Sequence, residues 1–136
     1  MRIESRARSR ALQALYAWDM RPGQSLERVA SAIWDDLSVT PGERAIASKI
    51  VRVVIADSAR IDRELEAVTT NWRLERLGAI DRAVLRLAAA ELSIGETPPK
   101  VVIQEAVRLA ERYGSVQSAR FVNGIVDALA RRMGRL

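Results

Sequence analysis

The sequence predicts an all-α protein. Apolar residues recur at spacings of three and four along the whole chain, as on one face of an amphipathic helix, and no segment alternates as a strand would. Glycine and proline interrupt this pattern at a few places, which divide the chain into helices. With 136 residues, the chain is long enough for one domain, or for two small halves that share a core.

The first helix is expected to end at Arg21-Pro22-Gly23, where proline and glycine close it. Ser25 is placed to cap a second helix, because its hydroxyl can accept a hydrogen bond from an amide of the first turn. The residues expected to face inward from this second helix are Leu26, Val29, Ala30, Ile33, Trp34 and Leu37.

The start of the third helix is the clearest boundary. Thr40 is a cap residue, Pro41 stands at the first helical position, and Glu43 follows three residues after the cap, as in a capping box. A break is expected near Asp57-Ser58. The predicted buried side consists of Ile46, Ile50, Val53, Val54, Ile61, Leu65 and Val68.

The pattern loosens between Asn71 and Gly78, which predicts a border between an N-terminal bundle of about residues 1–71 and a C-terminal bundle of about residues 72–136. The helix that follows is expected to end at the segment 95–99, which also starts the next helix. Tyr113-Gly114 stops that helix, and Ser115 caps the last one. The predicted inward residues of these three helices are Ile80, Val84, Leu87, Ala88 and Leu92, then Ile103, Ala106, Val107 and Ala110, then Ala119, Val122, Val126, Leu129 and Met133.

The composition favours a polyanionic partner. The net charge is +5, and all 22 basic residues except Lys49 and Lys100 are arginines, whose planar guanidinium suits phosphate and stacks on bases. An arginine-rich genome gives the same composition, so the composition alone does not identify the class of partner.

Histidine and cysteine are both absent. Disulfides and thiolate metal sites are therefore excluded, and the commonest general base and metal ligand is missing. We expect no metal, no cofactor and no enzymatic activity. No apolar run is long enough to span a bilayer and the first residues lack the apolar segment of a signal peptide, so the expected location is the cytoplasm, without membrane contact.

The first helix carries two distinct faces. At about 100° per residue, the apolar face consists of Ala7, Ala11, Ala14, Leu15 and Trp18, and the polar face consists of Arg6, Ser9, Arg10, Gln13 and Tyr16. The polar face offers guanidinium groups, an amide and an aromatic ring, which single-stranded nucleic-acid readers use. Arginines near a helix N-terminus also oppose the helix dipole, so their placement points to a function. We expect Arg8 to lie beyond the end of the core, where it could fold around a ligand.

The last helix carries residues that we expect to form a second side of a nucleic-acid-binding surface. Phe121, the only phenylalanine, lies at the margin of the apolar stripe, although a core position at a helix seam is the commoner case. Arg120 adds charge beside it. Gly124 in mid-helix costs about 1 kcal/mol relative to alanine, which indicates that something, such as a packed helix, approaches the backbone closely. Asn123 can bond a base or, equally well, a neighbouring backbone group.

Four segments of the chain resemble the NusB family of bacterial transcription antitermination factors. They are RSRALQALYAW at 8–18, LGAIDRAVLRLA at 77–88, PKVVIQEA at 99–106 and FVNGIVD at 121–127, in the family's order. The resemblance implies one NusB-like domain of two small perpendicular bundles. It also implies binding to the boxA element of nascent ribosomal RNA leader transcripts, with the NusE-type small-subunit ribosomal protein as partner and, through it, the transcription elongation complex.

The resemblance also implies which residues contact RNA. The expected RNA side consists of Arg6, Arg8, Arg10, Gln13, Tyr16, Ser118, Arg120 and Phe121. Asp81 matches an acidic position of the family near that surface, although a structural role at the start of a helix explains an acidic residue there equally well. Asn123 is a further candidate for contact with RNA or the partner. Gln117 stands where a family member carries an acidic residue. Because an acid repels phosphate, glutamine is expected to strengthen RNA binding.

Three other readings remain open at this point. The nearest is a stand-alone NusB-like adaptor that binds ribosomal RNA during its maturation, like the domain fused to some ribosomal RNA cytosine methyltransferases. The chain has no glycine-rich loop of the dinucleotide type and no cysteine, so the methyl-transfer half is absent. A structural adaptor and a helix-turn-helix DNA binder fit less well. Both a monomer and a homodimer are compatible with the sequence.

Overall fold

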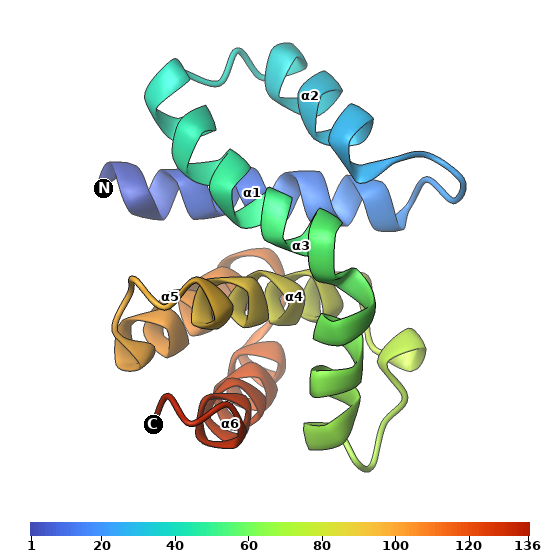
Figure 1. Cartoon of the computed structure of the whole chain (residues 1–136), viewed down its shortest axis with the longest axis vertical. Helices are drawn as coiled ribbons and strands as arrows, with labels where there is room; N and C mark the ends of the chain where they lie inside the picture. Colours follow the sequence, from blue (N-terminus) through green and yellow to red (C-terminus); the bar gives the residue numbers. More distant parts are fainter.

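Six α-helices and one 3-10 turn form the structure, a computed structural model that describes residues 1–136 (Figure 1). The elements are α1 (Ile3–Asp19), α2 (Leu26–Asp36), α3 (Pro41–Val68), η1 (Leu74–Arg76), α4 (Ala79–Ile94), α5 (Pro99–Tyr113) and α6 (Val116–Arg132). The predicted all-α class is confirmed. None of the helices combines the length and the apolar character needed to cross a bilayer.

The predicted caps begin three of the helices. The hydroxyl of Ser25 accepts a hydrogen bond from a first-turn amide of α2 at 3.2 Å. Thr40 does the same for α3 at 3.3 Å, and Ser115 for α6 at 3.0 Å. The capping box differs in one detail, because the Glu43 carboxylate accepts its hydrogen bond from the Thr40 hydroxyl, at 3.0 Å.

Backbone conformation explains the breaks. Asp57 has non-helical dihedral angles (φ −127°, ψ 25°), which confirms the break predicted there and bends α3. Gly95 ends α4 in the left-handed region (φ 78°), which favours glycine. The 3-10 turn η1 was not predicted, since three residues are too few to show a period.

The helix α1 lies between two groups of helices (Figure 1). The helix α2 and the first part of α3 pack on one side of α1, and α4 packs on the other. Beyond its bend, α3 continues to α4 and α6, so it contacts both groups. Ala7, Ala11 and Ala14 are fully buried, because only small side chains let the neighbouring helices approach α1 this closely.

The predicted core is largely confirmed. Leu37 is an exception: it stands at the C-cap of α2, just after the last helical residue, and is 45% exposed. Ile46 and Val107 are only half-buried. The other predicted inward residues are buried or pack against the core.

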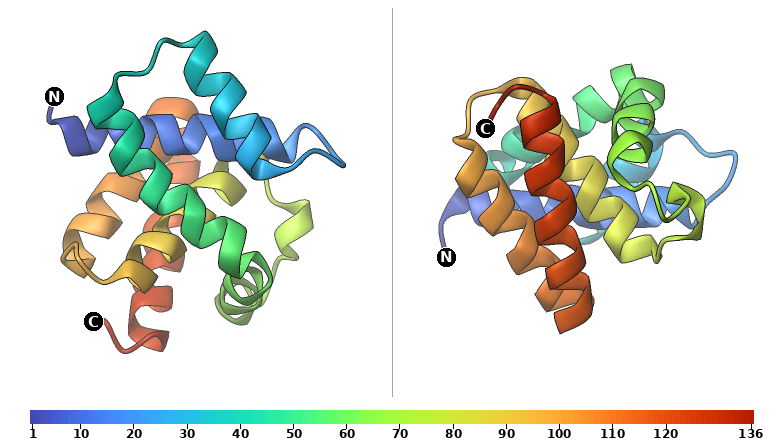
Figure 2. Two further views of the ribbon diagram at one scale, coloured as in Figure 1. Left: turned by 45° about the horizontal axis from the view of Figure 1, so that its top comes forward. Right: turned by 90° about the horizontal axis from the view of Figure 1, so that it is seen from below.

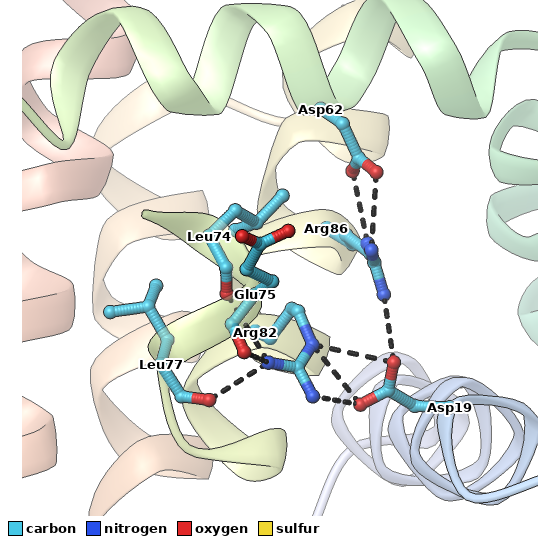
Figure 3. A network of polar contacts seen from close by, with 7 residues as sticks. All are labelled: Asp19, Asp62, Leu74, Glu75, Leu77, Arg82 and Arg86. Atoms are coloured by element: carbon cyan, nitrogen blue, oxygen red, sulfur yellow. Dashed lines mark hydrogen bonds and ion pairs between the residues drawn. The ribbon is translucent and has the colours of Figure 1, made fainter. Parts of the chain in front are cut away.

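A charged network joins the C-terminal end of α1 to α4 (Figure 3). The Asp19 carboxylate accepts hydrogen bonds from Arg82, at 3.1 Å from Nε to Oδ2 and also through Nη2, and from Arg86 at 3.4 Å. Arg86 in turn donates to both oxygens of Asp62 on α3, at 3.0 and 3.1 Å. Two arginines of α4 therefore hold three helices together.

Arg82 also fixes the loop that precedes α4 (Figure 3). Its Nη1 donates to the carbonyl oxygens of Leu74 at 3.2 Å, Glu75 at 3.3 Å and Leu77 at 2.8 Å. These carbonyls belong to η1 and the residue that follows it. Because the same guanidinium holds Asp19, the loop is fastened beside the end of α1.

Replacing Arg82 with alanine is expected to lower the free energy of unfolding by about 2 to 3 kcal/mol, because Asp19 loses its main partner and three carbonyls lose their donor. Urea denaturation monitored by circular dichroism measures this. Arg131→Ala is the control, since Arg131 forms an exposed ion pair with Asp127 within α6, and its loss is expected to change stability by less than about 0.5 kcal/mol. Equal effects of the two substitutions would show that the network does not stabilise the fold.

Candidate nucleic-acid interface

Most of the circumference of α1 is buried, and one stripe of it reaches solvent. We call the residues Arg6, Arg10, Gln13 and Tyr16 the first-helix stripe. Arg6 and Tyr16 are exposed, whereas Arg10 and Gln13 are half-buried. Their spacing of three and four residues places them on one side of the helix, as predicted.

Ser9, which was predicted to share this face, is buried. Its hydroxyl lies 3.5 Å from the Ser5 carbonyl oxygen, one turn earlier in the same helix. The exposed surface of α1 is thus narrower than the sequence indicated.

Glu43, from the first turn of α3, holds the two arginines of the stripe. Arg10 Nε donates to Glu43 Oε1 at 3.2 Å, and Arg6 Nε lies 3.7 Å from Oε2. Arg10 Nη1 also donates to the Gln13 side-chain oxygen at 3.3 Å. The Arg6 Nη1 donates to the Met1 carbonyl oxygen. In both arginines Nε faces Glu43 and Nη1 has a partner, while Nη2 makes no hydrogen bond within the chain and stays available to a ligand.

Glu43 is ionised at neutral pH. Its burial alone raises the pKa of the carboxyl group, but hydrogen bonds from Arg10 and Thr40 and the nearby charge of Arg6 outweigh this, and the pKa of Glu43 lies below its ordinary value. One buried carboxylate thus balances part of the charge of two arginines. The sequence identifies Glu43 only as a capping residue, because Arg6 and Arg10 precede it by more than thirty residues.

Arg8 is buried, and the prediction that it lies beyond the core is wrong. Its Nε and Nη2 donate to the two carboxylate oxygens of Glu91 on α4, at 2.5 and 3.0 Å, and its Nη1 lies 3.8 Å from Glu105. Burial alone lowers the pKa of Arg8, but Glu91 more than compensates and the pKa is raised. Only 7% of Arg8 is exposed, and its ion pair with Glu91 fastens α1 to α4.

Glu105 extends this ion pair to α5. It accepts hydrogen bonds from Ser5 and, at 2.9 Å, from Arg108, and these outweigh its burial, so the pKa of Glu105 lies below its ordinary value. Arg108 also donates to the Ser5 carbonyl oxygen at 3.2 Å. The N-terminal half of α1 is thereby fastened to both α4 and α5.

The predicted residues of α6 lie at and near its start. Arg120 is exposed and makes no ion pair, and Phe121 is half-buried with one side packed against the core. Ser118 is half-buried, and its amide donates to the Ser115 hydroxyl at 3.0 Å. Gln117 and Asn123 are both exposed.

Gly124 corrects one expectation about α6. Apart from the backbone of α6 itself and the two adjoining residues, no atom lies within 4 Å of the position that a Cβ at Gly124 would occupy, so no other helix packs there. The glycine instead leaves an open patch on the exposed side of α6, next to Asn123.

The structure keeps the α1 and α6 residues as two separate groups. Both helices pack on α4, and no hydrogen bond or ion pair joins one to the other. The turn between α5 and α6 projects beyond α1 in the right view of Figure 2. Asp81, in the first turn of α4, suits the helix dipole, but its buried Oδ1 has no hydrogen-bond partner.

The chain matches known proteins over nearly its whole length. The sequence profile of the NusB family matches residues 5–131. The transcription antitermination protein NusB of Sorangium cellulosum is 43% identical over 137 residues, which cover 100% of this chain and 97% of that protein. The corresponding protein of Anaeromyxobacter dehalogenans strain 2CP-1 is 45% identical over 129 residues, which cover 93% and 89%.

Solved structures share the fold. NusB of T. maritima superposes with a TM-score of 0.87 at 33% identity and covers 94% of this chain and 90% of its own. A chain from a crystal structure of the antitermination factors NusB and NusE in complex with double-stranded RNA gives a TM-score of 0.88 at 28% identity, with 97% and 98% covered.

Replacing Glu43 with glutamine is expected to lower the free energy of unfolding at pH 7 by about 1 kcal/mol, because charge-assisted hydrogen bonds become neutral ones. The folded pKa of Glu43 is depressed, so its contribution is present above the unfolded pKa and is lost as the pH falls through the folded one. The difference between wild type and variant should therefore shrink in acid.

Urea denaturation at pH 7 and at acidic pH measures that difference. Glu75→Gln is the control, since Glu75 is 73% exposed and pairs only with exposed Arg73, so its replacement should change stability little at either pH. A difference between wild type and Glu43→Gln that grows as the pH falls would contradict the interpretation.

Proposed function

This chain belongs to the NusB family, and from that premise we propose that it is an RNA-binding transcription antitermination factor. It binds the boxA element of nascent ribosomal RNA leader transcripts together with the NusE-type small-subunit ribosomal protein. The observation that carries the proposal is the first-helix stripe, because a helix that is otherwise surrounded exposes two arginines, an amide and a tyrosine along one line.

The stripe suits a single strand of RNA. Arg6 and Arg10, oriented by Glu43, offer free N–H groups to phosphate or base edges, and Gln13 offers an amide. The exposed ring of Tyr16 gives an unstacked base a surface on which to lie. Arg8 is left out of this contact surface, because it is committed to Glu91.

The start of α6 supplies the second part of the proposed surface. Arg120 is free to meet a phosphate, Phe121 can stack on a base, and Ser118 can donate to the strand. Gln117 and Asn123 lie beside them on the exposed side. Gln117 adds no negative charge there, so we expect it to favour phosphate more than an acid would.

The partner proposal draws on the solved complex of NusB and NusE with RNA, to which this chain is similar in fold. In this proposal the protein acts on nascent transcripts through the elongation complex, and it therefore works in the cytoplasm. It acts by binding and catalyses no reaction. That complex holds double-stranded RNA, whereas our proposal concerns a single strand, so the test includes a duplex. The alternative is a stand-alone adaptor for ribosomal RNA maturation, which needs no NusE-type partner.

Fluorescence anisotropy with labelled RNA tests the function. We expect salt-sensitive binding to single-stranded boxA RNA, weaker binding to scrambled RNA, much weaker binding to duplex DNA, and a rise in affinity when the NusE-type protein is added. A boxA duplex RNA measured alongside distinguishes strand from helix recognition. Equal affinity for boxA and scrambled RNA would refute boxA recognition, and no gain from the partner would favour the stand-alone adaptor.

The aromatic residues of the two groups give a residue-level prediction. Tyr16→Ala and Phe121→Ala should each weaken boxA binding by about 1 to 3 kcal/mol if their rings stack on bases. Tyr16→Phe is the matched control, because it keeps the ring and should keep most of the affinity. Circular dichroism checks the fold, and unchanged affinity in folded alanine variants would assign both rings to packing alone.

A further inference from the structure

Trp72 differs from the other two tryptophans in having no partner. The indole nitrogen of Trp34 donates to the Arg10 carbonyl oxygen at 3.0 Å, and the Trp18 ring lies 5.5 Å from the guanidinium of Arg86. Trp72 is 59% exposed, and its indole nitrogen makes no hydrogen bond within the chain. Leaving so large an apolar ring in water forgoes the stabilisation that burial would give, which points to a ligand that covers it.

The loop that carries Trp72 is not loose. The backbone amide of Trp72 donates to the Thr69 carbonyl oxygen at 3.0 Å, and the Thr69 hydroxyl donates to the Leu65 carbonyl oxygen at 2.9 Å. Two residues later, Arg82 holds the carbonyl of Leu74. The ring is therefore presented from a fixed turn between α3 and η1.

A shallow cavity of about 460 Å³ lies against this ring, and Trp72 is its only hydrophobic lining residue. The other lining residues are Glu66, Thr69, Thr70, Asn71, Arg73 and Glu75. A protein-binding hot spot needs an apolar pocket around its anchor, which this cavity lacks. A flat aromatic surface edged by polar groups suits a nucleobase instead.

The acidic edge narrows the choice of base. Glu66 makes no ion pair and repels phosphate, whereas Glu75 is paired with Arg73 at 3.6 Å, so the backbone of a strand is expected to avoid the Glu66 side of the cavity while a neutral base can enter it. Carboxylates accept hydrogen bonds. Cytosine, adenine and guanine each carry an exocyclic amino group with two N–H donors, whereas uracil offers only its N3–H, so the carboxylates favour an amino-bearing base. Arg76, which follows the lining residue Glu75 in η1, makes no ion pair and is available to a phosphate outside the cavity.

The position of the loop connects it to the first-helix stripe. The guanidinium of Arg82 contacts both Asp19, at the end of α1, and the carbonyls of η1 (Figure 3). Tyr16 precedes Asp19 by less than one turn, and Arg21, which makes no ion pair, follows it. A strand that continues past the end of α1 would therefore pass Arg21 and approach the loop that carries Trp72.

We propose that Trp72 is a second base-stacking site, which takes an amino-bearing nucleobase from the single-stranded RNA flanking boxA. The inference rests on the proposed function, since the flanking strand is delivered by the boxA segment bound at the first-helix stripe.

The test compares synthetic single-stranded RNAs: boxA alone, and boxA extended at either end by cytidines or by uridines. With the NusE-type protein present, the wild-type protein should bind one of the cytidine-extended RNAs about tenfold more tightly than boxA alone. The uridine-extended RNA should show a smaller gain in affinity. In Trp72→Ala the gain should disappear while affinity for boxA alone stays unchanged. Trp72→Phe, which keeps a ring, should retain most of the gain, and Ile55→Ala, an exposed apolar change on α3, should retain all of it.

The outcomes separate this inference from the proposed function. Failure of boxA alone to bind would refute the proposed function, whatever Trp72 does. Normal boxA binding with the same extension gain in wild type and Trp72→Ala would overturn only the second site. Weaker binding of Trp72→Ala to the NusE-type protein without RNA would also overturn it, because the ring would then belong to a protein interface.

Discussion

A buried ion pair between Arg8 and Glu91 determines how α1 sits in the molecule. Removing two charges from water is costly, and the two parallel hydrogen bonds of 2.5 and 3.0 Å, with Glu105 nearby, offset that cost only in one orientation of the helix. The network around Asp19 fastens the other end of the same helix. Because both ends of α1 are fixed, the helix cannot rotate about its axis. The first-helix stripe therefore faces solvent, opposite the side that holds Arg8 and Asp19.

The arginines of this chain serve two purposes. Arg8, Arg82, Arg86 and Arg108 are largely buried and join helices through carboxylates and carbonyls, so they add little to the outer surface. The basic surface comes from fewer residues than the composition indicates. A net charge of +5 therefore agrees with a polyanionic partner, but the placement of the unburied arginines is what locates the surface.

Local signals in the sequence predicted the helices well, because a cap such as Thr40 or a left-handed glycine such as Gly95 acts within a few residues. The polar face of the first helix was predicted for the same reason. The role of Arg8 was not, because its partner lies 83 residues away and a helical projection cannot show what packs against it. Glu43 as the residue that orients Arg6 and Arg10, and the fastening of the η1 loop by Arg82, likewise depend on tertiary contacts.

The central claim is that α1 binds RNA through its exposed arginines while a buried arginine holds it in place. Nitrogen-15 NMR of the arginine Nε–H groups during titration with boxA RNA tests this most directly, because each side chain reports separately. We expect the signals of Arg6 and Arg10 to shift on binding and the signal of Arg8 to stay in place. A shift of Arg8 with unchanged Arg6 and Arg10 would contradict the claim.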